Sequence, residues 1–412
     1  LTVTRTASGG AGGSSNGGGA GKGGAAVASR TFDDTKNATR SFTLSAASNA
    51  NGGAGGAGAG VTNGAAGGAA TVSLTLTGAH GVIAASTATG GAGGAASGAG
   101  VIGAGGSAIA TTVATAGGSL NASAVAHGGV GATAVGSATA TTTATGAFGT
   151  LLAAASTGPA SGQLIQSLST SAAGMVDGTS TDTAQTAVGG KAAAFDSISQ
   201  AVALETGAPN AASTSAVLSA NKAIANAFGG SPVFFAIGEL GGGYSSGGTI
   251  AQTTTVSLDE SVDLTKLGAR NDLVVGLYNG TAVGSGFTAM TFDLFADGID
   301  VIHQSFTSAA AATTFFTNHA FDLGSLAGGK LGANTLTLHA VMSITTNAAG
   351  SGFYGDLIVG DPPAKRSPSL ALHPFIQAMA GFGAEAEAGA ALAAGPAMGR
   401  FSHGMLIAPK TA

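Results

Sequence analysis

The sequence predicts a mainly β protein in which a Gly-rich rod precedes a more conventional β domain. Two features of composition support this fold class. The 412 residues include 73 Gly but no Cys and no Trp, and only 8% are charged, against about 25% charged residues and about 7% Gly in ordinary globular domains. Gly and Ala dominate the first half, whereas Phe, Leu, Asp and Val gather in the second.

Strand-like runs interrupt the Gly-rich sequence of residues 1–150. They alternate small apolar and hydroxyl residues with the period of two that is typical of strands. These runs are Ser41–Ser48, Thr71–Thr77, Ala108–Thr115 and Ala138–Thr145. Gly93, Gly105 and Gly117 each begin a Gly-Gly pair at equal spacing. Such a strand-plus-turn repeat predicts a β-solenoid or stacked hairpins with narrow, Ala-filled layers.

The Gly tracts carry a second period, of three residues. Gly recurs at Gly52, Gly55 and Gly58, and the same period returns between Gly91 and Gly106. A three-residue period suits a polyglycine-II-like helix packed against neighbours, and nine Pro are too few for collagen. A flexible linker is the plainer alternative. The sequence leaves the choice between solenoid and polyglycine-like rod open.

A short helical hairpin is predicted within residues 151–230, which we expect to form a helical connector. Apolar residues recur at helical spacing in Lys191–Glu205 and again in Ser213–Phe228. Gly207 and Pro209 separate the two segments, and a Gly-Gly pair at Gly229 follows the second. Two antiparallel helices joined by a short loop would result.

Residues 231–362 have the pattern of a C-terminal antiparallel β-sandwich or jelly roll. Large apolar side chains alternate along short segments, and turn signals such as Asn279-Gly280 and Asp297-Gly298 separate several of them. Several short strands at this density favour a sandwich with a real Phe- and Leu-rich core. The expected strands are Val233–Ile237, Thr253–Leu258, Leu273–Tyr278, Thr288–Leu294, Val301–Phe306, Thr335–Thr345 and Phe353–Val359.

The C-terminal tail, residues 363–412, contains a candidate polymerisation strand. Its segment Arg400–Ile407 is apolar and strand-like. A strand outside the main domain can add to the sheet of a neighbouring subunit, although packing within its own subunit is the alternative. The candidate residues are Arg400, Phe401, Met405, Leu406 and Ile407.

Three stretches carry a resemblance to a known group of proteins. Gln200–Tyr244, Phe292–Thr317 and Phe353–Gly360 resemble a module of exported proteobacterial proteins that join Gly/Ala/Thr-rich repeats to a C-terminal β-rich domain. These are PEP-CTERM-like surface proteins, but the Val-Pro-Glu-Pro sorting tail is lacking here. The resemblance implies an exported surface protein and supplies no catalytic residues. A chain that begins at Leu1 instead of Met fits a processed, secreted form.

Motifs for catalysis or cofactor binding are not found in the sequence. No two of the seven His have a ligand spacing such as HxxxH, and no Cys is present. Asp293, Asp297 and Asp300, with Glu260 and Asp263, suggest calcium only weakly, because their spacing matches no EF-hand and a solvated hairpin turn explains them. We therefore expect no cofactor, no metal and no enzymatic activity.

Charge and hydropathy limit the partners. A net charge of −5 does not suit a nucleic-acid surface. The Ala-rich stretch Leu370–Ala397 is interrupted by Glu385 and Glu387, so we expect no membrane span.

The leading functional hypothesis is a non-catalytic subunit of a secreted bacterial filament or surface layer, whose partner is a copy of itself. The alternative is a stalked adhesin that binds a carbohydrate or matrix polysaccharide through the β-sandwich. The absence of Trp and the presence of only three Tyr weigh against it. A polysaccharide-active enzyme would need a carboxylate pair in a cleft, to which nothing in the sequence points.

The alternating Thr residues allow one further function. Thr139, Thr141, Thr143 and Thr145 would lie on one face of a strand, where they could order water and bind ice. The plainer explanation is that Thr is favoured in strands.

Overall fold

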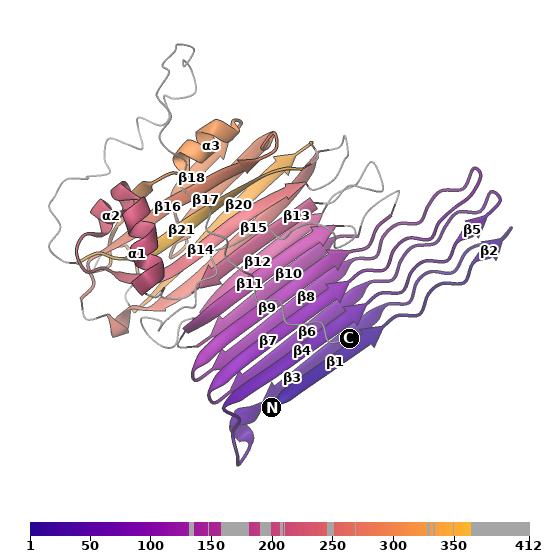
Figure 1. Ribbon diagram of the computed structural model, residues 1–412, viewed down its shortest axis with the longest axis horizontal. Helices are drawn as coiled ribbons and strands as arrows, with labels where there is room; N and C mark the ends of the chain where they lie inside the picture. Colours follow the sequence, from indigo (N-terminus) through magenta and orange to yellow (C-terminus); the bar gives the residue numbers. More distant parts are fainter. Residues whose placement is uncertain are drawn as a thin grey trace, which may run out of the picture. The chain divides into compact units, whose positions relative to one another are not determined.

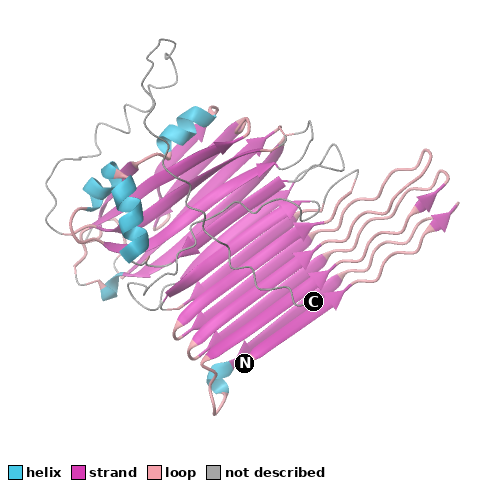
Figure 2. Ribbon diagram, viewed as in Figure 1, coloured by secondary structure: helices cyan, strands magenta, loops and turns pink. Residues whose placement is uncertain are grey.

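The computed structural model describes residues 1–131, 136–146, 148–157, 181–189, 199–206, 209, 211–244, 251–267, 269–327, 330–332, 334–348 and 350–363. These residues belong to one compact unit, Leu1–Ala364. The unit is mainly β, with two large sheets of ten and nine strands and a small sheet of two (Figures 1 and 2). Among the described residues, no helix has the length and apolar character needed to cross a membrane.

In the N-terminal half, successive strands alternate between the two large sheets. Neighbouring strands within each sheet are parallel there, and their registers are unbroken. The first sheet contains β1 (Thr2–Ser8), β4 (Thr43–Asn51), β7 (Gly81–Thr89), β9 (Ser119–Gly128) and β11 (Phe148–Thr157). The second contains β3 (Ala26–Asp33), β6 (Ala70–Gly78), β8 (Ala108–Ala116) and β10 (Ala138–Thr145).

The period-two pattern explains these strands. On β8, Ala108, Ala110, Thr112 and Ala114 are buried between the sheets, while the residues that alternate with them face outward. Ala side chains keep the interlayer space narrow, so the Ser86 hydroxyl of the first sheet lies 2.6 Å from the Thr112 hydroxyl of the second. All four strand-like runs predicted in residues 1–150 are confirmed as β4, β6, β8 and β10.

In the C-terminal half, the same two sheets continue with antiparallel strands. The first sheet adds β13 (Ser199–Thr206), β14 (Val233–Tyr244), β21 (Ser351–Asp361), β16 (Asp272–Val283) and β19 (His319–Ser325). The second adds β12 (Thr181–Gly189), β15 (Gln252–Asp263), β20 (Thr335–Thr346), β17 (Ala289–Ala296) and β18 (Ile299–Phe306). All seven strands predicted for this region are present, and each is antiparallel to its neighbours.

Gly-rich segments project beyond the strand ends of the N-terminal half (Figure 1). They include the two-residue strands β2 (Ser15–Asn16) and β5 (Gly58–Ala59). Their hydrogen bonds recur at every third residue: the backbone N–H groups of Gly9, Gly12 and Ser15 donate to the carbonyls of Asn51, Ala54 and Ala57. Other N–H groups cross between layers, as from Gly24 to Gly10. The three-residue period of the sequence is therefore a hydrogen-bonding period. We call these segments the glycine bundle (residues 9–25, 52–69, 90–107, 128–131 and 136–137).

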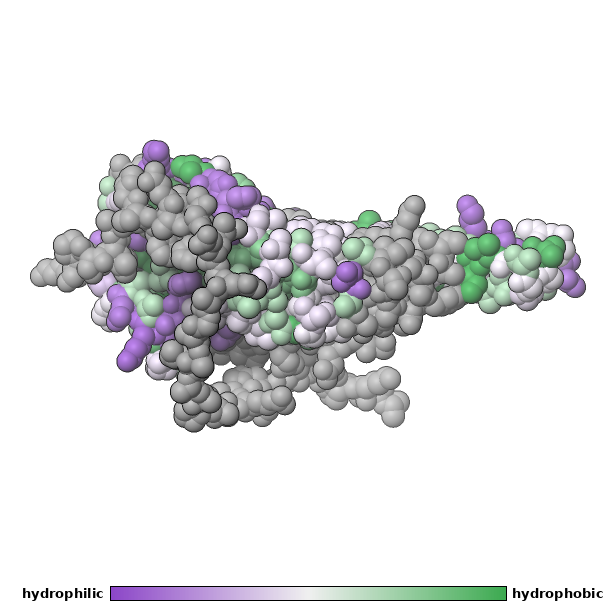
Figure 3. Space-filling view, turned by 90° about the horizontal axis from the view of Figure 1, so that it is seen from above, coloured by the Kyte–Doolittle hydropathy of each residue, from purple (hydrophilic) through white to green (hydrophobic). Residues whose placement is uncertain are grey.

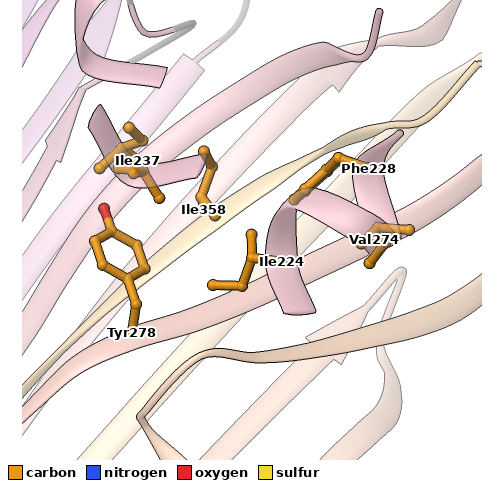
Figure 4. Packing of buried hydrophobic residues seen from close by; sticks show 8 residues of the cluster. Ile224, Phe228, Ile237, Val274, Tyr278 and Ile358 are labelled. Atoms are coloured by element: carbon orange, nitrogen blue, oxygen red, sulfur yellow. The ribbon is translucent and has the colours of Figure 1, made fainter. Parts of the chain in front are cut away.

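Helices cover the outer face of the first sheet in the C-terminal half. α1 (Ala211–Ala220) and α2 (Lys222–Phe228) pack onto a cluster from three strands, shown in Figure 4. Gly276 allows this contact, because an added Cβ would lie 2.8 Å from Ile224 Cγ2. The buried cluster comprises Val217, Ile224, Ala227, Phe228, Ile237, Val274, Tyr278 and Ile358.

Phenylalanines fill the space between the sheets in the same half. The short helix α3 (Ala309–Phe315) begins at Ser308, whose hydroxyl accepts a hydrogen bond from Ala311 N. It is followed by Phe316, whose ring centroid lies 5.0 Å from that of Phe292 on the second sheet and 5.5 Å from that of Phe353 on the first. The expected Phe-rich core is confirmed here.

Two expectations need correction. The helix predicted over Lys191–Glu205 is wrong from Ser199 onward, because Ser199–Thr206 forms β13; residues 190–198 lie outside the described residues. The segment forms a strand despite its helical spacing of apolar residues, because β11 and β14 provide backbone hydrogen-bond partners on both sides of it. The helical hairpin lies instead within residues 211–228, with a break at Asn221, whose side-chain amide donates to Val217 O. Because the sheets are mixed, the structure establishes a mainly β chain but not a solenoid.

Candidate functional site

Both large sheets end at strands that are paired on one side only. Within the described residues, β1 pairs with β4 alone and β3 pairs with β6 alone. The unpaired side of such strands presents backbone N–H and C=O groups that can recruit another chain. Since β1 and β3 end the two sheets at the same side, we call them together the open edge.

The glycine bundle has an open side next to this edge. Inside the bundle, an added Cβ at Gly9 or Gly12 would lie 1.9 Å from a carbonyl oxygen of a neighbouring segment. At Gly10, Gly13 and Gly19, an added Cβ would meet nothing within 4 Å. Gly costs about 0.5–1 kcal/mol relative to Ala in regular structure. The subunit therefore has Gly at these three positions although a larger side chain would fit there without a clash in the folded subunit.

Positive charge lies along the open edge. The register places Arg5 opposite the buried Ser48 and Arg30 opposite the buried Leu74, so both arginines occupy core-facing rows. An inward-facing charge on an edge strand prevents indiscriminate strand pairing. Beyond Arg40, no Lys, Arg, Asp or Glu occurs before Asp177. A partner for this edge must therefore accommodate cations at defined positions.

The predicted polymerisation strand lies outside the described residues. Arg400, Phe401, Met405, Leu406 and Ile407 all fall in the undescribed range 364–412, so their role stays a prediction. In the structure, the strands with an unpaired side at this end of the sheets are β1 and β3, which the sequence analysis did not predict. The alternation in Thr2–Ser8 and Ala26–Asp33 could have revealed these strands, but not that they form an edge.

Three of the acidic residues considered for calcium, Asp263, Asp293 and Asp297, have other partners. The Asp297 carboxylate accepts hydrogen bonds from the N–H groups of Gly332 and Thr337, and Asp263 accepts one from Thr265 N. Asp293 contacts His303 on the neighbouring strand, while Asp259 lies 2.5 Å from His339. The part of the chain that the structure describes contains no group of three or more His, Cys, Asp or Glu arranged to hold a metal ion.

A buried carboxylate pair was also missed from sequence. Glu239 on β14 lies directly opposite Asp356 on β21, and Asp356 lies opposite Tyr278 on β16. The side-chain amide of Asn279 donates to Asp356 Oδ2 at 2.7 Å. Burial raises the pKa of Asp356 to about 7 and, with the nearby carboxylates, raises the pKa of Tyr278. The sequence feature that could have revealed this pair is Glu239, the single charged residue in the otherwise apolar strand β14.

The carboxylate pair is closed to substrates. Glu239 is 4% exposed and Asp356 5% exposed, which leaves no room for a sugar between them. Burial of Asp356 favours its protonated form. The Asp356 carboxyl group can therefore respond to pH.

Comparisons with known proteins give little. No family model and no curated protein matches the chain. Among solved structures, the carbohydrate-binding module CBM51 from Clostridium perfringens GH95, in complex with methyl-galactose, aligns at 14% identity. The alignment covers 28% of this chain and 73% of that one, with a TM-score of 0.14. At that score the likeness carries no argument about fold or ligand.

Proposed function

We propose that this chain is a non-catalytic structural subunit of a secreted bacterial filament or surface layer, and that copies join through the open edge. The open side of the glycine bundle carries this proposal. Gly10, Gly13 and Gly19 match the interior glycines in type, but an added Cβ at these positions would meet nothing within 4 Å. A second copy that places a backbone there would repeat the contact already made inside the bundle.

In this proposal, residues 1–145 form a solenoid-like rod with polyglycine-like projections. Each pass adds one strand to each sheet, so the rod has a natural direction of growth. At the far side, within the described residues, the sheets end at β19 and β18. Asp300, an exposed residue on β18, offers a negative charge for the basic open edge. Contact between two different ends is heterologous and gives an open filament when the rotation does not close.

The test fills the open side without disturbing the subunit. Gly10→Val and Gly13→Val add side chains where the subunit has space, so the fold should persist by circular dichroism while assembly is lost. Ala11→Val is the matched control, because Ala11 is exposed between the two glycines. Light scattering after size-exclusion chromatography and negative-stain electron microscopy would report assembly of the full chain. Assembly by the Gly variants equal to that of the control would contradict the proposal.

The tail strand needs its own experiment. Deleting residues 400–412 should prevent polymerisation if Arg400–Ile407 links subunits. Normal filaments from this truncated chain would reject that role and leave the open edge as the contact. A chain that stays monodisperse in every form would bring forward the stalked adhesin, for which glycan binding is the measurement.

A further inference from the structure

The outer face of the second sheet carries a regular grid of side chains over β3, β6, β8 and β10. The parallel registers align these strands without offset, so outward residues form straight rows. We call this surface the threonine grid. Its four rows are Val27–Thr71–Ile109–Thr139, Ser29–Ser73–Thr111–Thr141, Thr31–Thr75–Val113–Thr143 and Asp33–Thr77–Thr115–Thr145.

The chemistry of the grid is nearly uniform. Every position except Val27, Asp33, Ile109 and Val113 carries a hydroxyl. Most of these residues are Thr, which presents a methyl group beside its hydroxyl. Each outward residue is exposed or half-buried, whereas the residues between them on β6, β8 and β10 are buried. The face therefore combines hydrogen-bonding and apolar groups at most points of a two-dimensional repeat.

The dimensions of the grid follow from the backbone. Neighbouring strands lie about 4.8 Å apart, and alternate residues along a strand are about 6.6 Å apart. The strand spacing is close to the shorter repeat of water oxygens on a prism face of hexagonal ice. Figure 1 shows these strands running side by side with little change of direction. The backing is rigid, because Thr112 Oγ1 bonds to Ser123 O across the sheets at 2.7 Å and Thr142 Oγ1 to Leu152 O at 2.6 Å.

We propose that the threonine grid binds ice. An ordered lattice of water is neutral, and this face is almost neutral: Asp33, at one corner, is its one charged position and is paired with Lys36 at 3.0 Å. Figure 3, which views the molecule from above and not onto the grid, shows strongly hydrophilic residues both near the helices and at the far end of the glycine bundle. A flat polysaccharide would instead call for aromatic side chains, and none occupies a grid position.

The outer face of the first sheet provides an internal comparison. Its strands β4 and β7 have the same lengths and the same alternation as β6 and β8. Their outward residues, however, mix Ser45, Ala47 and Asn49 with Ile83 and Thr87. Since both faces share one scaffold, strand formation alone does not select Thr for every row. The regularity belongs to the second sheet.

The experiment measures thermal hysteresis and incorporation of the full chain into a slowly growing ice hemisphere. Wild type should shape ice crystals and enter the ice, whereas Thr111→Lys should abolish both by raising a charged group from the centre of the grid. Thr87→Lys, on the outer face of the first sheet, is the matched control and should keep wild-type behaviour. Circular dichroism would verify that both variants are folded.

Three outcomes would overturn the inference. Wild type could enter ice no better than serum albumin, Thr111→Lys could remain as active as wild type, or Thr87→Lys could lose activity equally. The inference goes beyond the proposed structural function and does not depend on it. The Gly10→Val variant should bind ice whether or not it assembles, so failure of one proposal is distinguishable from failure of the other.

Discussion

The two halves of the molecule share the same pair of sheets but are stabilised differently. In the N-terminal half the layer between the sheets is rich in Ala, as at Ala28, Ala110 and Ala140, with a few larger side chains such as Leu44 and Leu74. In the C-terminal half it holds large side chains such as Phe292 and Phe353. Burial of one large apolar side chain stabilises a protein by about 1.5–3 kcal/mol, far more than one Ala methyl can. The N-terminal half must therefore rely on backbone hydrogen bonds and close approach.

This difference shows what each kind of core permits. Where the inward residues are small, as on β8 and β10, the register between the parallel strands is unbroken and the outward residues form straight rows. A Phe-rich core packs irregularly and is accompanied by register shifts, as between Leu294 and Phe295. Regular strand registers in the N-terminal half suit a repeating surface, whereas the Phe-rich core of the C-terminal half contributes more to the stability of the fold.

The largest expected effect is the loss of a C-terminal core ring. Phe292→Ala removes the contacts with Phe315 and Phe316 and should lower the free energy of unfolding by about 3–5 kcal/mol. Its counterpart, Ala110→Gly, should cost only about 1 kcal/mol. Urea unfolding followed by circular dichroism would compare the two. Equal losses would mean that the halves do not differ in the way their cores suggest.

The carboxylate pair makes the C-terminal half sensitive to pH. Burial raises the pKa of Asp356 from 3.8 to about 7, so the folded chain holds a proton that the unfolded chain releases. Stability should therefore fall as pH rises from about 4 to about 7, by at most about 1.4 kcal/mol per pH unit, and then level off.

Asp356→Asn should remove that slope, because the amide stays neutral and its oxygen can still accept from Asn279. Asp300→Asn, at an exposed position on β18, is the matched control and should leave the slope unchanged. Thermal unfolding across this pH range is the measurement. A slope that survives in Asp356→Asn would assign the pH dependence to another group.

The sequence predicted local structure better than assembly. The period of two in Ala108–Thr115 and Ala138–Thr145 was sufficient to predict β8 and β10, because alternation of Ala and Thr matches the pleat of a strand. The helix expected over Lys191–Glu205 failed over Ser199–Thr206, where pairing with two neighbouring strands overrides spacing. Pairing between segments that are distant in the chain cannot be predicted from the residues of one segment alone.

The sites were harder to predict for the same reason. An open edge is defined by which strands lack a neighbour, and the residues of β1 do not encode that. The Glu239–Asp356 pair joins residues far apart in the chain, so only the lone Glu in an apolar run hinted at it. The threonine grid was predictable in part: the sequence showed the alternating Thr of one strand, Thr139 to Thr145, but not the register between strands.

The last prediction concerns the close approach that replaces large side chains in the N-terminal half. A Cβ at Gly91 would lie 2.0 Å from the carbonyl oxygen of Gly53, so Gly91→Val must push two backbones apart. We expect a loss of about 1–3 kcal/mol, typical of overpacking. Ala92→Val is the matched control, because the exposed Ala92 has room for the larger side chain.

The effect should also be local. Hydrogen exchange should quicken at Gly91, Gly68 and Gly106, whose N–H and C=O groups are linked in series, while the amides of β14 and β21 stay protected. Equal acceleration in both halves would show that the glycine bundle and the Phe-rich core unfold as one unit. Unchanged exchange in the bundle would show that its segments tolerate separation, and close approach would then not be what stabilises the N-terminal half.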